Sequence, residues 1–415
     1  IEEKVPYLHA MIPSEVVRIG HITAQGNLRS NSTQGNITLD IDSDAGTIQA
    51  RANIDNKGYY TTHITGKDIN IAKAIPTSPL TRTDIILQAE GTITDMQSLL
   101  SGKQGLTIPT GTFKGMATQT ILMGYEYKNI QLNGAYSPHI YSGKIAIDDP
   151  NGQLNLQARY DESQLQPQYT AQIVADSINL HALNLIDIHE GRSFSARLNG
   201  NIKGKQFNHM TGSIKIDSLT MHREGDDYSI NSIALYSFES ETKTLSLNSD
   251  FMNAAVKGDF TYQTIMRSLL AHLHDYLPSL CPSHNHRHIT SSNQCLVDLQ
   301  IKDTEPLKEL LLIPISIDKT ASIVAQFYDE SRSVGLDIQI PQLTYNGNDL
   351  ANVVLQCKTN GHKAEIQGQG SLYNDDTHIA ATLQATAKED KLSIGALWQS
   401  NPADFFTGAF STDVF

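Results

Sequence analysis

Ile64-Thr-Gly-Lys-Asp-Ile-Asn-Ile71 returns 109 residues later as Ile173-Val-Ala-Asp-Ser-Ile-Asn-Leu180. The next segment keeps the same offset, because Leu87-Gln-Ala-Glu-Gly-Thr-Ile93 corresponds to Ala196-Arg-Leu-Asn-Gly-Asn-Ile202. Repetition at a fixed spacing indicates an array of similar units rather than a single closed core.

Apolar and polar residues alternate in many segments, and a period of two predicts strands with one apolar face. Clear examples are Ile37/Leu39/Ile41, Ile48/Ala50/Ala52/Ile54, Leu154/Leu156/Ala158, Val297/Leu299/Ile301 and Leu336/Ile338/Ile340. Turn signals such as Asn56-Lys-Gly58 and Asn346-Gly347 separate the strands and predict antiparallel neighbours. A further echo relates Ala254, Val256 and Gly258 to Ala364, Ile366 and Gly368 at an offset of 110 residues.

A long meander with one apolar face must close, pair with a second sheet or curl into a trough. Glycines within strands, such as Gly91, Gly200 and Gly258, favour curling because they permit sharp bends in a sheet. The sequence therefore predicts an all-β protein: an elongated, U-shaped antiparallel β-groove built from repeats. Its apolar inner side could carry acyl chains.

One amphipathic helix is expected near residues 262–280, where apolar residues recur at spacings of three and four. We predict that it packs over the apolar sheet face; a gate, or a surface that touches lipid headgroups, are the alternatives. The covering residues would be Ile265, Met266, Leu269, Leu270, Leu273 and Leu277. Shorter helices are expected at 95–100 and 305–312. These elements divide the chain into a repeated groove segment (1–260), a helix-containing insertion (261–320) and a continuing groove segment (321–415).

Composition excludes some function classes. The chain has 44 acidic and 31 basic residues, a formal charge of −13, and no Lys/Arg cluster, which argues against a nucleic-acid partner. The longest apolar run, Leu310–Ile317, is far shorter than the roughly 20 residues of a membrane-spanning helix. Because the sequence opens at Ile1 without a signal segment, we interpret it as an internal piece of a longer protein.

Two motifs resemble metal sites. Asp40-Ile-Asp-Ser-Asp-Ala-Gly46 departs from a calcium loop at its sixth position, Ala45, so we expect Asp40 and Asp42 to face solvent on a strand. A soft metal could be gathered by Cys281, His284, His286, His288 and Cys295, but their spacing fits no established zinc pattern. A solvated loop, closed by a Cys281–Cys295 disulfide with Cys357 left unpaired, is the favoured interpretation. No metal site is predicted.

Catalytic signatures are missing from the sequence: it has no Gly-x-Ser-x-Gly, no His-Glu-x-x-His and no phosphate-binding loop. We therefore expect neither an enzyme nor a cofactor.

Four segments share one resemblance: Thr65–Ile71, Leu198–Gly204, Leu247–Phe260 together with the helical segment that follows, and Asp303–Leu307. They resemble TamB proteins of the Bacteroidetes lineage. The resemblance places the chain in the AsmA-like group of bridge-forming proteins. It implies a non-enzymatic β-groove (β-taco) in the periplasm of a Gram-negative bacterium, anchored in the inner membrane by a helix that this chain lacks. It also implies an outer-membrane barrel partner of the TamA/BamA kind, with roles in phospholipid transport between the membranes, outer-membrane protein assembly and secretion.

Our leading hypothesis is a groove whose inner face binds phospholipid acyl chains and passes them along its axis. The predicted lining is Ile214, Ile216, Ile233, Leu235, Leu245, Leu247, Ala254 and Val256. One alternative is a β-scaffold that hands unfolded barrel strands to an outer-membrane insertase along an exposed edge. The other is an adhesin or glycan-binding array of β-sandwiches.

Overall fold

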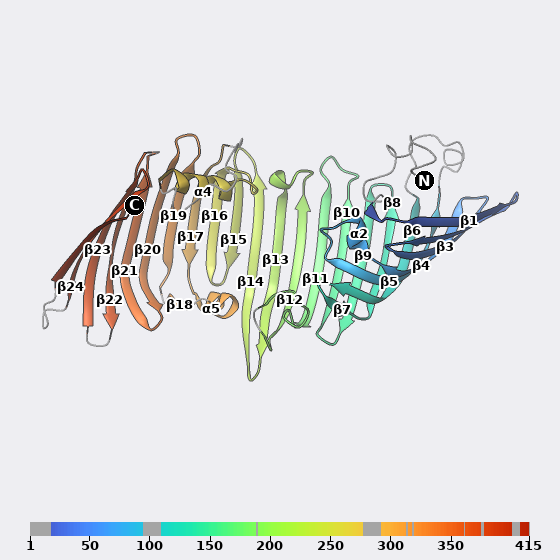
Figure 1. The fold of residues 1–415 in the computed structure, drawn as a ribbon, viewed down its shortest axis with the longest axis horizontal. Helices are drawn as coiled ribbons and strands as arrows, with labels where there is room; N and C mark the ends of the chain where they lie inside the picture. The colour runs from blue at the N-terminus through green and yellow to red at the C-terminus, as the bar shows by residue number, and fades with distance from the viewer. Residues whose placement is uncertain are drawn as a thin grey trace. The chain divides into compact units, whose positions relative to one another are not determined.

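The computed structural model describes residues 18–93, 109–187, 190–276, 292–312, 314–317, 319–360, 362–374, 377–400 and 407–414. The fold is nearly all-β, with about 70% of the chain in strands and 6% in helices. The 25 strands of the described residues belong to one open antiparallel sheet (Figure 1). The predicted fold class is confirmed.

The chain divides into two compact units, which are described separately. Unit 1 comprises Ile1–Asn201 and Ser218–Tyr228, and unit 2 comprises Ile202–Asp217 and Ser229–Phe415. The boundary crosses three strands: β12 (Ser193–Lys203), β13 (Thr211–Arg223) and β14 (Asp226–Glu239).

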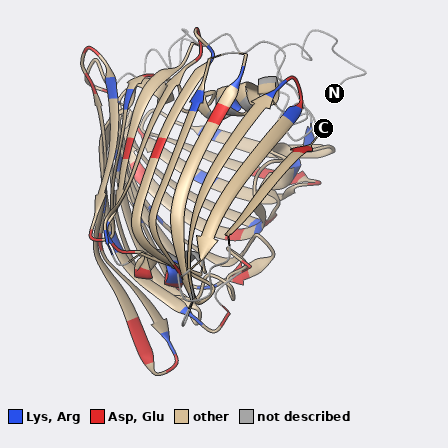
Figure 2. Cartoon of the chain, turned by 90° about the vertical axis from the view of Figure 1, so that its left-hand side faces the viewer, with Lys and Arg blue, Asp and Glu red and all other residues tan. Residues whose placement is uncertain are grey.

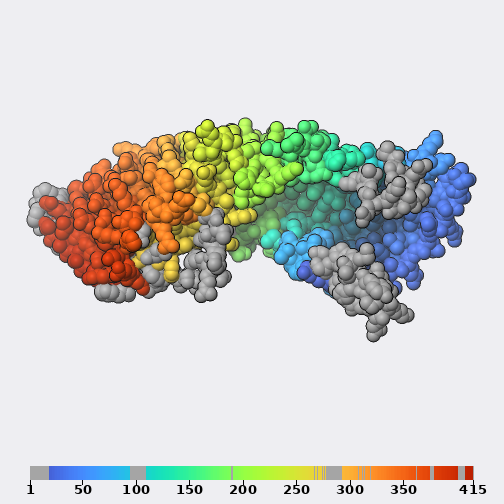
Figure 3. Space-filling view, turned by 90° about the horizontal axis from the view of Figure 1, so that it is seen from above, coloured from blue at the N-terminus to red at the C-terminus, as the bar shows by residue number. Residues whose placement is uncertain are grey.

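Unit 1 is a meander in which each strand pairs with the next one in the chain. The exception is β6 (Thr110–Leu122), which pairs both with the short β7 (Tyr125–Tyr127) and with β8 (Ile130–Ser137). Its other strands are β1 (Ile22–Ser30), β2 (Gln34–Ser43), β3 (Gly46–Asp55), β4 (Tyr59–Ile69), β5 (Leu80–Thr92), β9 (Ile140–Asp149), β10 (Gly152–Asp161) and β11 (Gln168–Ile178). A single helical turn, α2 (Ile71–Ala74), follows β4. The space-filling view shows this unit hollowed between its blue and its teal strands (Figure 3).

Unit 2 is a second meander, and it carries the longer helices. Its strands beyond β14 are β15 (Lys243–Ser249), β16 (Met252–Asp259), β17 (Gln294–Ile301), β18 (Ile315–Ser316), β19 (Ala321–Tyr328), β20 (Ser333–Tyr345), β21 (Asn348–Thr359), β22 (Ala364–Asn374), β23 (Thr377–Lys388), β24 (Lys391–Ser400) and β25 (Thr407–Val414). The helices are α4 (Ile265–Tyr276) and α5 (Glu305–Leu311), and the 3-10 turn η2 is Phe207–His209. Both α4 and α5 lie where helices were predicted; the expected helix at 95–100 lies outside the described residues.

The 109-residue repeat has a structural counterpart in a kink near the end of β4 and of β11. The equivalent residues Asp68 and Ser177 adopt left-handed backbone conformations, with φ values of 54° and 52°. Two residues later, the N–H groups of Asn70 and Asn179 donate to the carbonyls of Ala45 and Asn151, at 2.8 Å in both cases. The repeated Asn therefore has the same local role in both copies.

At both kinks, the backbone N–H of the left-handed residue donates a hydrogen bond to a side-chain oxygen. The N–H of Asp68 donates to Asp84 Oδ1 at 2.6 Å, and the N–H of Ser177 donates to Ser195 Oγ at 2.9 Å. In each case a side chain replaces a carbonyl acceptor at the bulge, so the N–H does not stay unsatisfied.

The 110-residue echo in unit 2 differs from this. Paired residues, followed from strand to strand, lead from Val256 to Ile366. In the same way they lead from Ala254 to Gly368, and not to Ala364. The two segments therefore run in opposite directions, because an odd number of antiparallel steps separates β16 from β22. The echo marks a common apolar alternation and not an equivalent position.

Candidate functional site

The apolar side chains of unit 1 form rows that cross the strands. Leu39 pairs with Ala50, Ala50 with Ile64, and Ile64 with Leu87, and the row continues strand by strand. The complete central row is Leu39, Ala50, Ile64, Leu87, Gly115, Leu132, Ile145, Leu156 and Ile173. Because side chains alternate between faces, all of these residues lie on one face of the sheet.

This face is incompletely covered. Every side chain in the central row of unit 1 is half-buried, whereas a second layer packed on the sheet would bury such residues almost completely. Ile37, in the neighbouring row, is 44% exposed. The row therefore offers apolar surface to a ligand.

The opposite face of the same strands is polar. One of its rows is Thr38, Arg51, His63, Gln88, Lys114, Asn133, Lys144, Gln157 and Gln172. Asp40 and Asp42 lie on this face of β2 and are exposed, as predicted. One side of unit 1 is thus suited to water and the other to an apolar ligand.

A row of tyrosines borders the apolar face near one end of the strands. Tyr136 pairs with Tyr141, Tyr141 with Tyr160, and Tyr160 with Tyr169. The ring centroids of Tyr141 and Tyr160 are 6.1 Å apart and those of Tyr160 and Tyr169 are 4.8 Å apart, both in stacked geometry. Together with Tyr60 on β4, these residues are called the tyrosine row.

Two glycines connect Tyr60 to the rest of the tyrosine row. Tyr60 pairs with Gly91 on β5, Gly91 with Gly111 on β6, and Gly111 with Tyr136 on β8. Above these two positions without side chains, the hydroxyls of Tyr60 and Tyr136 are hydrogen-bonded to each other. Burial and this partner raise the pKa of Tyr60 above its ordinary range, so its phenol stays neutral.

Unit 2 has equivalent apolar rows. Leu247 pairs with Ala254, Ala254 with Leu299, and Leu299 with Ile323. The full row, from β14 to β25, is Leu235, Leu247, Ala254, Leu299, Ile323, Ile338, Leu355, Gly368, Leu383, Ala396 and Phe410. Its side chains are half-buried up to Ala396, and Phe410 is 51% exposed.

Register brings together most of the predicted lining residues. Leu235, Leu247 and Ala254 lie in this row, Leu245 pairs with Val256 in the next row, and Ile233 shares their face because it is two residues from Leu235 on β14. All six are half-buried. Ile214 and Ile216 on β13 are also half-buried and alternate with exposed residues. A shared face is what a lining role requires, and the role itself stays a prediction.

A third row of unit 2 is covered, and helix α4 covers it. Ile265 packs against a cluster of Phe260, Cys295 and Phe327, which are only 5–6% exposed. At the other end of α4, Tyr276 is buried with Ala364 and Ala387. The helix thus crosses the strands from β16 to β23 on their apolar side, as predicted for a packing element.

Of the residues predicted to form the covering face of α4, Ile265 makes this contact, whereas Leu270 is 44% exposed. Leu270 therefore lies on the solvent side of the helix, because its position places it more than a quarter turn away from Ile265. The side chains of Met266, Leu269 and Leu273, and residue Leu277, lie outside the described part of the structure.

A buried polar network holds α4 in place. Asp329, after β19, accepts hydrogen bonds from Ser268 Oγ at 3.0 Å, from His272 at 3.0 Å and from the backbone N–H of Asn293 at 2.7 Å. Burial by itself would raise the pKa of the Asp329 carboxyl, but the hydrogen bonds from Asn293, Ser268 and His272 together hold it below its ordinary value. Asp329 therefore serves as an ionised anchor for the helix.

Lys243 is a second buried charge on the covered side. Its Nζ donates to the carbonyl of Phe260 at 2.7 Å and lies 4.9 Å and 4.5 Å from the ring centroids of Phe260 and Tyr262. Burial lowers the pKa of Lys243. The carbonyl and the two rings compensate part of the cost of removing the ammonium from water.

Charged residues occupy little of the strand surface. Most of the strand surface that is visible in Figure 2 carries neither Lys/Arg nor Asp/Glu. No cluster of three metal-ligating side chains was found among the described residues. The segment with Cys281, His284, His286 and His288 lies outside them, so the predicted loop and disulfide stay predictions; Cys295 itself is buried in the Phe260 cluster.

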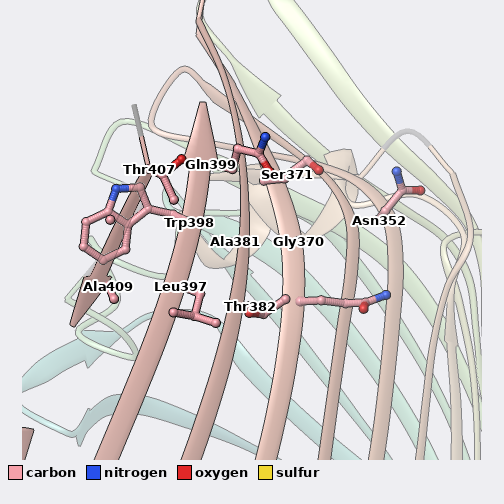
Figure 4. Close-up of a pocket in the computed structure, with 13 residues that line it drawn as sticks. Asn352, Gly370, Ser371, Ala381, Thr382, Leu397, Trp398, Gln399, Thr407 and Ala409 are labelled. Carbon is pink, nitrogen blue, oxygen red and sulfur yellow. The ribbon is translucent and has the colours of Figure 1, made fainter. Parts of the chain in front are cut away.

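A separate hollow of about 640 Å³ lies on β21–β25. Its lining includes Thr382, Leu397 and Ala409, which belong to the face opposite the apolar rows, and Leu397 is 61% exposed (Figure 4). Trp398, from the apolar face, packs over Gly408, where a Cβ would fall 1.9 Å from its ring. The hollow is open and has no charged lining, so we assign it no chemistry.

No protein-family model matches the chain, and no curated protein matches it significantly. Among the described residues, none of the helices combines the length and the apolar character needed to cross a membrane. The functional argument therefore depends on the geometry of the apolar rows.

Sequence reasoning missed the tyrosine row, the Asp329 network and Lys243. The sequence contains a signal for the tyrosine row. Near strand ends, it places tyrosines at positions that continue the apolar alternation: Tyr136, Tyr141, Tyr160 and Tyr169. The hydrogen-bonded partners in the Asp329 network are 25–61 positions apart in sequence, and no spacing rule connects them.

Proposed function

We propose that this chain binds phospholipid acyl chains on the apolar face of its sheet and supports their movement between the inner and outer membranes. The observation that carries the proposal is the continuous row of half-buried apolar side chains in each unit. Each methylene group that becomes buried away from water contributes about 0.8 kcal/mol of favourable free energy to binding.

The arrangement suits a conduit better than a closed site. Neighbouring positions in a row are one strand apart, about 4.8 Å, and carry similar aliphatic side chains. An acyl chain shifted by one strand therefore meets nearly the same contacts, so the free-energy barrier between positions is small. Headgroups can stay in water beyond the strand ends.

The resemblance to TamB supplies the setting of the proposal: a periplasmic, non-enzymatic bridge protein of a Gram-negative bacterium, anchored in the inner membrane outside this chain, with an outer-membrane barrel of the TamA/BamA kind as partner. Phospholipid transport, outer-membrane protein assembly and secretion are the processes proposed for it. The open single sheet supports this proposal over a sandwich adhesin, in which two sheets would cover each other's apolar faces.

Native mass spectrometry after incubation with phospholipid vesicles tests the proposal. We expect adducts of phospholipid mass on the wild-type chain and a several-fold loss of adducts in Leu235→Asp, because a carboxylate on the apolar face costs several kcal/mol to desolvate. The matched control is Thr244→Asp, which places the same charge on the polar face, opposite Lys257.

A corresponding pair tests unit 1. Ile64→Asp should reduce lipid adducts, and His63→Asp, its neighbour on the polar face beside Arg51, should not. Circular dichroism checks whether all four variants remain folded. A wild-type chain without phospholipid adducts would overturn the proposal and favour the strand-handover scaffold, which needs an exposed edge rather than an apolar face.

A further inference from the structure

The tyrosine row of unit 1 combines an aromatic surface with a carboxylate. Tyr160 Oη donates to Glu162 Oε2 at 2.9 Å, just beyond the end of β10. His139 Nδ1 lies 3.4 Å from the other carboxylate oxygen. Glu162 therefore sits at the strand end next to the stacked rings of Tyr141, Tyr160 and Tyr169.

No Lys or Arg of β9 or β10 shares the face of this carboxylate. The basic residues of β9 and β10, Lys144 and Arg159, lie on the opposite, polar face, since they alternate with the row positions. Arg159 is moreover paired with Asp161 at 2.8 Å. His139 is 65% exposed. On β9 and β10, Glu162 is thus not neutralised by a Lys or an Arg.

The rings remain accessible to a ligand. Tyr169, at the end of the stack, is 37% exposed, and Tyr141 and Tyr160 are half-buried. Aromatic faces beside a carboxylate are the arrangement that attracts ammonium groups, because the ring quadrupole and the carboxylate both favour a cation. Stacked phenol rings at the border of an apolar surface also suit the boundary between acyl chains and water.

We propose that the tyrosine row, with Glu162, is a headgroup site that selects phospholipids whose headgroup carries an ammonium, of the ethanolamine or choline type, over anionic phospholipids. This inference rests on the proposed lipid-binding function and adds a headgroup preference to it. Acyl chains lie on the apolar rows, while the headgroup ammonium lies against Tyr160, Tyr169 and Glu162. An anionic headgroup at the same place meets a carboxylate and no strong base.

The test uses vesicles containing equal amounts of phosphatidylethanolamine and phosphatidylglycerol, with the two lipids quantified on the isolated protein by mass spectrometry. We expect the wild-type chain to enrich phosphatidylethanolamine several-fold. Glu162→Gln and a double Tyr160→Leu/Tyr169→Leu variant should bring the ratio close to that of the vesicles.

The chain offers a matched control. Tyr59 Oη donates to Glu90 Oε2 at 2.9 Å, but this Tyr–Glu pair lies on the polar face of β4 and β5. Glu90→Gln should leave the lipid ratio unchanged. If both glutamate variants changed the ratio equally, net charge and not the tyrosine row would set the preference, and the inference would be wrong.

The outcomes also separate this inference from the proposed function. Bound lipid at the vesicle ratio in the wild-type chain would overturn the headgroup site and leave the acyl-chain face intact. A protein without any bound lipid would overturn both. Exclusive recovery of phosphatidylglycerol would contradict the sign of the electrostatic argument.

Discussion

Tyr60 and Tyr136 are joined through their hydroxyls, although β5 and β6 lie between the strands that carry them. The contact exists because both intervening strands have glycine at this height, Gly91 and Gly111. A Cβ at Gly91 would lie 2.8 Å from the Tyr60 hydroxyl, and one at Gly111 would lie 2.7 Å from that of Tyr136. The two rings lean toward each other over the glycines and extend the tyrosine row across unit 1.

Gly111→Ala should destabilise unit 1. Its Cβ would also fall 2.4 Å from the carbonyl oxygen of Glu90, so the neighbouring strand must shift. We expect a loss of about 1–3 kcal/mol in the free energy of unfolding, the range of overpacking. Urea denaturation followed by circular dichroism measures it.

Gly143→Ala is the control for this change, because it lies on the same face of unit 1 and its Cβ would have its nearest neighbour at 3.7 Å. This variant should be neutral or slightly stabilising. Equal losses in the two variants would show that the clash at Gly111 is not the cause.

Tyr160 should ionise unusually late. The hydrogen bond to Glu162, followed by burial and the negative charge of Glu162, raises the pKa of Tyr160 to about 12. The phenolate absorbance of the wild-type chain minus that of Tyr160→Phe should therefore show one group that titrates near this value.

In Glu162→Gln, the same difference titration should move toward the ordinary tyrosine value of about 10, because both the charge and the strong acceptor are removed. A titration unaffected by Glu162→Gln would show that this pair does not form in solution.

Asp329→Asn should loosen helix α4. The Asn side chain cannot accept all the hydrogen bonds that Ser268, His272 and Asn293 donate, and we expect a loss of about 2–3 kcal/mol for a buried, charge-assisted network. Hydrogen–deuterium exchange of residues 265–276 should rise. Glu330→Gln, a neighbouring exposed acid, should leave this exchange unchanged.

The contribution of Asp329 should depend on pH. Its pKa is lowered in the folded state, so the stabilisation is present above the unfolded aspartate value of about 3.9 and is lost as pH falls through the lower folded value. The stability difference between wild type and Asp329→Asn should therefore be constant near neutral pH and shrink below about pH 4. A difference that does not change between pH 7 and pH 2 would contradict an ionised anchor.

The first repeat kink should depend on Asp84. Asp84→Ala removes the acceptor for the N–H of Asp68, and we expect a loss of about 1–2 kcal/mol, as for a hydrogen bond to a charged group. Ser195→Ala should cost less, about 1 kcal/mol, at the equivalent kink because the acceptor there is neutral. Asp40→Ala, on the exposed face of β2, is the control, and thermal unfolding distinguishes the three.

Sequence alone determined the class of the fold and the identity of its apolar face. Alternation in segments such as Ile48/Ala50/Ala52 has a period of two, and that period depends only on local backbone geometry. The offset between Ile64–Ile71 and Ile173–Leu180 likewise identified a repeated structural element, because the kink at Asp68 and Ser177 is set by residues close in sequence. The position of helix α4 followed from its own periodicity.

Tertiary structure alone decided which strands place which residues side by side. The tyrosine row requires a register relating Tyr60 to Tyr136, 76 positions apart, and a slip of one residue would move every member to the other face. The Asp329 network and the burial of Lys243 likewise depend on where α4 and β17 come together. Long-range register is fixed by the sum of many cross-strand contacts, and no short segment contains that sum.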